Sequence, residues 1–167
     1  MAVQDRFQPS LLDRLTDDAP GETQEGRDKR VLSFRQLREA VMRDLIWLLN
    51  TAPLGAQEDL APHPQTASSV LNYGLPPLAG RTVSGLDGAG LERVLRQTIQ
   101  TFEPRILKNS LKVKVLLAED RMSHNAVTFR IEGELWATPM PQRLLLQGHV
   151  DLESGKIAIT DGAGRGA

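Results

Sequence analysis

The stretch AVTFRIEGELWA, residues 126–137, decides the fold class. Apolar side chains recur at every second position in it, at Val127, Phe129 and Ile131, and the residues between them are polar or charged. Successive side chains of a β-strand point to opposite faces of the sheet. This period of two therefore predicts a strand with one buried and one solvated face.

Three further stretches show the same alternation and are separated by turn-forming residues. They are LKVKVLL at 111–117, RLLLQGHVDL at 143–152 and KIAIT at 156–160. Short connections such as TPMP and ESGK favour sequential antiparallel pairing. We therefore expect a four-stranded, mainly antiparallel meander with one apolar face that other elements must cover.

A helix is predicted over residues 34–50, before the strands. Ser33 and Gln36 have the spacing of a capping box, and Leu32 and Leu37 that of a hydrophobic staple. Apolar residues recur at helical spacing and cover most of the circumference in the last turns. A helix of this kind is buried along that part of its length.

Two more helices are predicted, over about 64–73 and about 87–102. In the latter, Glu92 and Arg96 are spaced as an i,i+4 ion pair. This helix must end before Pro104, because proline disfavours helical geometry in the residue that precedes it. Three helices on a four-stranded sheet make a two-layer α+β domain.

The domain organisation follows from composition. We expect an N-terminal arm over residues 1–31, an α+β domain over 32–160 and a disordered, glycine-rich tail over 161–167. In the arm, a short amphipathic helix is followed by a polar linker over 16–30. Leu11, Leu12 and Leu15 share one side of this helix and must dock either on this domain or on a partner protein; the sequence leaves both possibilities open.

Composition limits the functions that the chain can have. Its formal net charge is -1, so there is no electrostatic case for binding nucleic acid or an anionic membrane. It has no cysteine, which excludes disulfides and thiolate metal sites. The longest apolar run, residues 45–49, is far too short to cross a bilayer. The N-terminus is polar, so we expect no leader and a cytoplasmic location.

No constellation of residues indicates catalysis, a metal or a cofactor. His63, His124 and His149 lie on separate predicted elements without metal-ligand spacing. A G-x-S-x-G nucleophile motif and a phosphate-binding P-loop are both absent from the sequence.

Glu132 and Glu134 are the nearest approach to a catalytic carboxylate pair. They lie two residues apart on one strand face, about 7 Å along the strand, which falls in the range that glycosidases use. Neighbouring outward positions carry cations that would form cross-strand pairs with them. These cations are Lys112, Lys114, Arg130 and Arg143. A solvated charged face is therefore the preferred interpretation.

The triplet Glu103, Pro104 and Arg105 ends the last predicted helix. The proline fixes the direction in which the chain leaves the helix. Two interpretations of the flanking charges remain. They form an ion pair that pins the helix to this domain's own sheet, or they make charge-assisted contacts with another protein.

The last predicted strand is a candidate for partner binding. An antiparallel meander has two open edges, and natural proteins usually protect such edges. Here the sequence offers little protection beyond Lys156. The backbone at Ile157 and Ile159 is therefore a candidate site for addition of a partner's strand.

Five segments together carry a resemblance to a known family. They are SLLDRLTDD, SFRQLREAVMRDLIWLLNT, SSVLNYGLPPLAG, LERVLRQTIQTFEPRI and VDLESG, in this order over roughly residues 10–157. In content and order the chain resembles the TssE family of type VI secretion baseplate subunits, which is related to the baseplate wedge proteins of contractile phage tails. The Glu-Pro-Arg triplet and VLNYGLP are the most specific elements of the resemblance.

The resemblance implies a structural, non-enzymatic role in a multi-subunit ring. It implies a baseplate docked at the inner-membrane complex of a Gram-negative bacterium, without membrane insertion or nucleic acid. Partners would be the baseplate subunits TssF, TssG and TssK and the sheath proteins TssB and TssC, whose polymerisation begins on this platform. It also marks Glu103, Pro104 and Arg105 as the family signature. Because relatives have been labelled lysozyme-like, a peptidoglycan hydrolase is the alternative.

Overall fold

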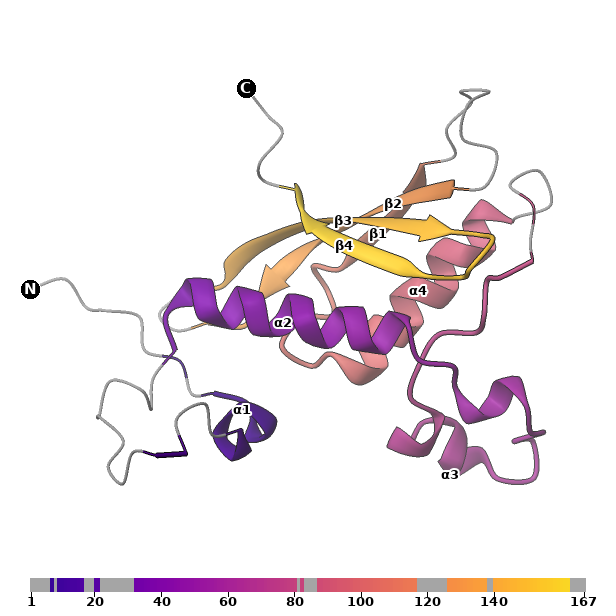
Figure 1. The fold of residues 1–167 in the computed structure, drawn as a ribbon, viewed down its shortest axis with the longest axis horizontal. Helices are drawn as coiled ribbons and strands as arrows, with labels where there is room; N and C mark the ends of the chain where they lie inside the picture. Colours follow the sequence, from indigo (N-terminus) through magenta and orange to yellow (C-terminus); the bar gives the residue numbers. More distant parts are fainter. Residues whose placement is uncertain are drawn as a thin grey trace, which may run out of the picture.

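A four-stranded sheet and two long helices across one of its faces form the body of the molecule (Figure 1). The computed structural model describes residues 7, 9–16, 20–21, 32–80, 82, 87–116, 126–137 and 140–162. Most of the predicted linker, the strand end at Leu117, His124 and the tail from residue 163 lie outside the described residues.

The sheet is an antiparallel meander in the order β1-β2-β3-β4. Its strands are β1 Lys112–Leu116, β2 Ala126–Leu135, β3 Gln142–Asp151 and β4 Ile157–Asp161. In the register, Val113 lies opposite Ile131, and Ile131 lies opposite Leu146. All three side chains are buried, so the predicted apolar face and the α+β class are confirmed. Strand β4 extends to Asp161, a residue that we expected to belong to the tail.

The two long helices lie close to their predicted bounds. The helical elements are α1 Leu11–Leu15, α2 Phe34–Leu49, η2 Leu54–Ala56, α3 Pro64–Ala67, η3 Val70–Asn72 and α4 Gly88–Phe102. At the start of α2, the Gln36 N–H donates to Ser33 Oγ at 3.3 Å, and the Ser33 N–H donates to Gln36 Oε1 at 2.9 Å. This reciprocal pair is the predicted capping box.

The single helix predicted over 64–73 is wrong, because the segment divides into α3 and η3. Ser69 begins a new turn, since its Oγ accepts a hydrogen bond from the Leu71 N–H at 3.2 Å. The Asn72 amide nitrogen donates to the Ala67 carbonyl at 2.9 Å. Serine and asparagine side chains compete with the helical backbone for its hydrogen bonds, and here they interrupt it.

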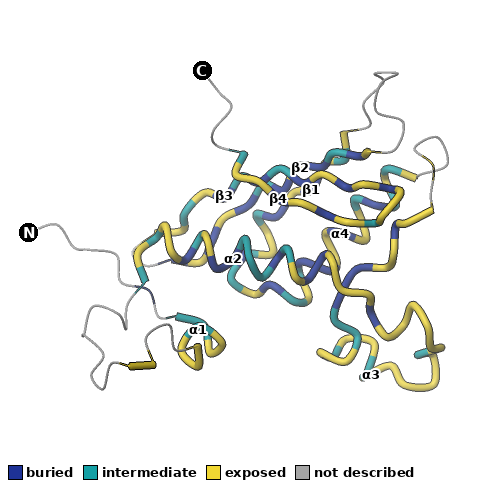
Figure 2. Tube along the Cα trace, in the orientation of Figure 1, coloured by how far each residue is buried: buried dark blue, intermediate teal, exposed yellow. Residues whose placement is uncertain are grey.

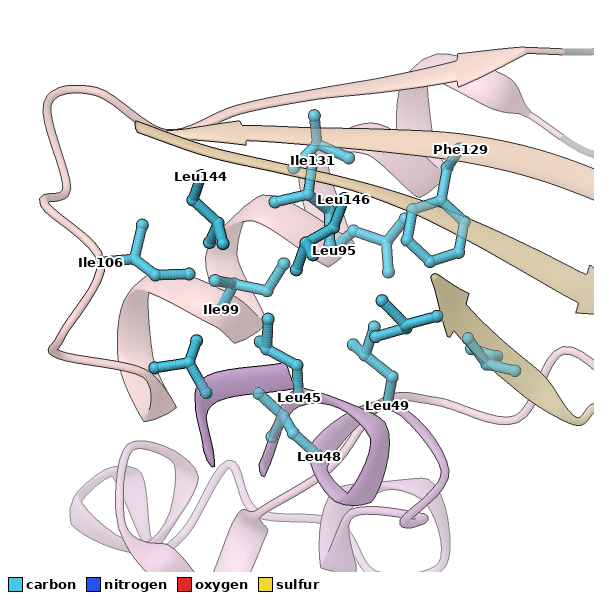
Figure 3. Packing of buried hydrophobic residues seen from close by; sticks show 14 of the residues in the cluster. Leu45, Leu48, Leu49, Leu95, Ile99, Ile106, Phe129, Ile131, Leu144 and Leu146 are labelled. Atoms are coloured by element: carbon cyan, nitrogen blue, oxygen red, sulfur yellow. The ribbon is translucent and has the colours of Figure 1, made fainter. Parts of the chain in front are cut away.

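The core lies between the two long helices and the sheet (Figure 3). Leu45 of α2 and Leu95 and Ile99 of α4 are fully buried, as are Phe129 and Ile131 of β2. Buried positions recur along the strands and on α2 and α4 (Figure 2). Burial of apolar area on this scale is the main source of the domain's stability.

Both edge strands are closed in part by helix side chains. At β4, the Asn50 side-chain amide donates to the Ile157 carbonyl at 2.8 Å and accepts from the Ile157 N–H at 2.9 Å. At β1, the Val115 N–H donates to Glu92 Oε1 at 2.9 Å. Glu92 thus binds the sheet edge in place of the predicted pairing with Arg96.

The interpretation that Lys156 alone protects the β4 edge is wrong. Besides Asn50, Arg38 of α2 reaches the far end of β4, where its Nη2 lies 2.5 Å from Asp161 Oδ1. The same nitrogen donates to the Leu145 carbonyl at 3.1 Å. Arg38 of α2 and Asn50, which caps the C-terminus of α2, therefore bind opposite ends of this edge strand.

We predict that Gly148→Ala destabilises the domain. A Cβ at this position of β3 would lie 2.1 Å from Phe129 Cζ, and the ring is fully buried and has no space to move. Overpacking of this kind costs about 1–3 kcal/mol in the free energy of unfolding, which urea denaturation measures.

Gly21→Ala is the matched control, because no atom of the described residues beyond its chain neighbours lies within 4 Å of the added Cβ. We expect a change below about 0.5 kcal/mol there. Equal stabilities of the two variants would contradict the packing of Phe129 against Gly148.

Candidate functional site

The Glu-Pro-Arg turn is fixed by its backbone before any side chain acts. Helix α4 ends at Phe102, as predicted, and the Glu103 N–H still donates to the Ile99 carbonyl at 2.8 Å. Beyond Pro104, the Arg105 carbonyl accepts from the Trp136 N–H at 2.7 Å. The next residue forms an antiparallel bridge with the end of β2. The turn is therefore tied to both layers of the domain.

Within the turn, Glu103 and Arg105 form a two-pronged ion pair. Arg105 Nε donates to Glu103 Oε1 at 2.7 Å, and Nη2 donates to Oε2 at 2.5 Å. The Arg105 N–H adds a third hydrogen bond to Oε1 at 3.2 Å. The Glu103 residue is only 3% exposed, so this carboxylate depends on Arg105 for its charge compensation.

Asp44 of α2 is the partner that the sequence analysis missed. Arg105 Nη2 also donates to Asp44 Oδ2 at 2.6 Å. The other oxygen of Asp44 accepts from Arg43 Nε at 2.9 Å and from Arg43 Nη2 at 2.7 Å. The internal ion pair that we considered thus exists, but it joins the turn to α2 rather than to the sheet.

The same line of charges continues to the N-terminal arm. Arg43 Nη1 lies 2.7 Å from Asp13 Oδ1 on α1. Carboxylates and guanidinium groups alternate from one end of this line to the other. We call it the charge chain: Asp13, Arg43, Asp44, Arg105 and Glu103. It joins α1, α2 and the turn after α4, which are far apart in the sequence.

The arm therefore docks on its own domain through a charge, while its leucines face outward. Ser10 and Asp13 form a capping box at the start of α1. Leu11 is 71% exposed and Leu15 is 75% exposed, and Leu12 lies at the rim of a hollow. Of the two possibilities that the sequence left open, docking of these leucines on a partner therefore stays a prediction.

This hollow has a volume of about 260 Å3 and an aromatic lining. Trp47 contributes an indole that is half exposed, over which Arg43 Cζ lies 5.1 Å from the ring centroid. Tyr73 and Phe102 meet edge to face at 5.3 Å between ring centroids. Pro104 and the charged groups of the turn complete the wall.

The electrostatics of the site favour the charged forms of Arg105 and Asp13. Burial opposes the charge of Arg105, but the hydrogen bonds and negative charges of Glu103 and then Asp44 raise its pKa above the ordinary value. Burial likewise acts against ionisation of Asp13, but hydrogen bonds from Ser10 and Arg43 lower its pKa overall. Each charge is committed to a neighbour, so the arrangement supports recognition and positioning rather than proton transfer.

The other sequence candidates lie elsewhere. The Ile157 and Ile159 side chains are buried in the core. Glu132 lies opposite Lys112 in the register, and Glu134 lies opposite Arg143, on the outer face of the sheet. Within the described part of the chain, no three potential metal ligands come together.

The family of the protein is shown by its sequence. The model of the family described as baseplate wedge protein gp25 matches residues 35–140. This range is more than half of the chain and includes α2, α4 and the Glu-Pro-Arg turn. The chain therefore belongs to the baseplate wedge gp25 family, whose members are structural and generally non-catalytic components of contractile, tail-like systems.

As a member of this family, the protein works with other baseplate and sheath subunits. No curated protein and no solved structure matches the chain. In the part that the structure describes, none of the helices has the length and apolarity needed to cross a bilayer. Of the charge chain, only Asp13 lies outside the matched range.

We predict that Arg105→Ala strongly destabilises the domain, because it leaves the buried Glu103 carboxylate without a counter-charge. Breaking a buried pair from one side costs about 3–5 kcal/mol in the free energy of unfolding. In the double variant Glu103→Gln, Arg105→Ala, we expect a smaller loss, since no buried charge is left unpaired. Urea denaturation of both variants measures the difference.

Arg35→Ala removes an arginine from the exposed pair with Glu39 on α2 and serves as the control. We expect no measurable change in its midpoint of unfolding. Equal midpoints for Arg105→Ala and Arg35→Ala would show that the buried pair does not support the fold.

Tyr73 is the only tyrosine in the chain, and its ionisation reports on the site. Burial, followed by the charges of Asp44 and Glu103, raises its pKa above the ordinary value of 10.0. We therefore predict that ultraviolet titration of the folded protein gives a midpoint above this value. In the unfolded protein the tyrosine midpoint should fall to the ordinary value. In folded Asp44→Asn it should lie between the midpoints of the folded and unfolded unchanged protein.

The same shift has a consequence for stability at high pH. Because the folded-state pKa is raised, this contribution is fully present below about pH 10 and is lost as the pH rises through the folded-state pKa. A folded protein with an ordinary tyrosine midpoint would contradict the placement of Tyr73 beside these carboxylates.

Proposed function

We propose that this protein is a TssE-like baseplate subunit of a bacterial type VI secretion system, with a structural and non-enzymatic role. The observation that carries the proposal is membership of the baseplate wedge family. The assignment to the secretion branch rests on the resemblance to the TssE family, of which the Glu-Pro-Arg turn and the VLNYGLP segment are the most specific elements. The proposed location is the cytoplasmic baseplate at the inner-membrane complex of a Gram-negative bacterium.

In this proposal, the hollow and α1 form the contact surface for the neighbouring wedge subunits TssF, TssG and TssK. Pro104 and the half-exposed Trp47 offer rigid apolar groups, and Leu11 and Leu15 add a flanking apolar side. Glu103 is buried, so it acts by holding Arg105 in place. Rigid groups lose little conformational entropy on binding, which suits a subunit of a fixed scaffold.

We also propose that the sheath proteins TssB and TssC begin to polymerise on this protein, with β4 as the contacting edge. The Asp151 N–H donates to the Lys156 carbonyl at 3.0 Å. Hydrogen-bonded and non-hydrogen-bonded residue pairs alternate along an antiparallel ladder, so the N–H and C=O groups of Ile157 and Ile159 point away from β3. Asn50 occupies those of Ile157. A sheath strand would therefore pair at Ile159 first and displace Asn50 as it extends.

The alternative of a peptidoglycan hydrolase has less support. Glu132 and Glu134 lie on the outer face of the sheet among cations, with Arg130 Nη1 3.9 Å from Glu132 Oε1. A glycosidase needs a carboxyl group with a raised pKa in a cleft that holds a sugar chain. Murein digestion that is lost in Glu132→Gln would favour this alternative over the structural role.

Trp47→Ala tests the proposed contact surface. A tagged copy of the chain in the source bacterium should co-purify TssF, TssG and TssK, and Trp47→Ala should lower their yield about tenfold. The reason is that half-exposed aromatic groups beside a hollow are typical binding hot spots, and losing one costs more than about 1.4 kcal/mol. Quantitative mass spectrometry of the captured proteins measures the yield.

Trp136→Ala is the matched control, because this second tryptophan is also exposed but does not line the hollow. Its yield of wedge subunits should equal that of the unchanged chain. In the same strain, deletion of the gene should abolish fluorescent sheath assembly. Normal sheaths after deletion, or capture of phage tail proteins alone, would refute the proposal.

A further inference from the structure

Four cations surround a second hollow, of about 350 Å3, at the β1 side of the sheet. Lys112 and Lys114 project from β1, Arg130 projects from β2, and Arg96 comes from α4. All four residues are exposed. We call these four residues the β1 cation patch. It shares no lining residue with the hollow at the Glu-Pro-Arg turn.

The patch carries an excess of positive charge. Among the described residues of its lining, Glu132 is the one carboxylate, so these four cations and one anion together carry a charge of +3. Glu132 Oε1 lies 3.9 Å from Arg130 Nη1, so this carboxylate is already paired with one of the four cations. Lys114 lies directly opposite Arg130, and like charges in this position destabilise a sheet.

Several arginines elsewhere in the described part of the chain have close carboxylate partners. Examples are Arg35 with Glu39, Arg38 with Asp161 and the charge chain. By contrast, the side-chain nitrogens of Arg96, Lys112 and Lys114 have no hydrogen bond or ion pair with described residues. Three cations without a partner among the described residues therefore line one hollow, and other such cations, among them Arg93, Lys108, Arg143 and Lys156, lie outside it.

From this juxtaposition we propose that the β1 cation patch binds an acidic segment of a partner protein. Lys112 and Lys114 are about 7 Å apart along the strand, and Arg130 is about 5 Å from Lys114 across it. This spacing matches the carboxylates at alternate positions of an extended peptide. One phosphate-sized anion would reach only part of the row.

The contact is made by side chains rather than by addition of a strand. The Val115 N–H, which faces the open side of β1, already donates to Glu92. Recognition therefore depends on charge and falls as salt screens it. This binding site is separate from the proposed contact surface for the wedge subunits, and its ligand is an acidic protein segment.

The test uses the purified full chain and a fluorescent peptide with glutamate at alternate positions and serine between. Its affinity is measured by fluorescence anisotropy at low and high salt. We expect Lys112→Gln, Lys114→Gln to weaken binding about tenfold, since two charge contacts are lost. The melting temperature should stay equal or rise, because the like-charge pair with Arg130 is relieved. A loss of stability would show that these lysines serve the fold, and would overturn the proposal.

Lys108→Gln, Lys156→Gln removes the same charge outside the patch and should bind the peptide as the unchanged chain does. Arg96→Gln, on α4, should weaken binding without any change in the sheet. Equal weakening in the control, or equal binding of a glutamine version of the peptide, would overturn the proposal.

Two further probes identify the occupant. Inorganic polyphosphate and single-stranded DNA of equal charge should compete poorly with the peptide, and tighter binding of either would overturn the assignment to an acidic protein segment. The assay needs no secretion protein. Its failure and failure of the baseplate proposal are therefore separate results.

Discussion

The buried carboxylate of Glu103 is the constraint on which the arrangement of the site depends. Glu103 is 3% exposed, and a buried carboxylate is tolerated only with a close counter-charge. Arg105 provides this counter-charge through its Nε and Nη2 nitrogens. The guanidinium then has a fixed direction and meets Asp44 of α2 at 2.6 Å. One desolvated group thereby sets the position of the end of α4 relative to α2, while backbone hydrogen bonds tie the same turn to β2.

From Asp44 the charge chain continues through Arg43 to Asp13 on α1, at the surface of the domain. Arg43 connects Asp44 to Asp13, which places α1 beside α2 while the α1 leucines face outward. The result is a rigid, aromatic hollow with fully paired charges at its base. Paired charges and rigid aromatic groups make such a surface well suited to hold another subunit. A rigid surface of this kind is what a structural subunit of a baseplate needs, and the chain belongs to a family of such subunits.

The sheet complements this surface in a different way. Asn50, at the end of α2, binds backbone groups of β4, and Glu92 of α4 binds a backbone N–H of β1. Without these two side chains, the backbone groups would be unpaired at the edges of the sheet. Such closure limits uncontrolled strand pairing, which is a hazard for any exposed meander. In the assembly that we propose, a partner strand displaces one side chain at β4, and an acidic segment contacts the side chains of the β1 cation patch. Each partner surface thus has its own chemistry.

The sequence by itself determined the elements, because their signals are local. A period of two specified the four strands, and Ser33 with Gln36 specified the start of α2. Local competition also explains the one broken helix, where Ser69 starts a new turn. Only the tertiary structure decided which groups meet: Asp44 and Arg105 are 61 residues apart, and Asn50 and Ile157 are 107 apart. Periodicity carries no information on such pairs, because their contact depends on how the layers pack.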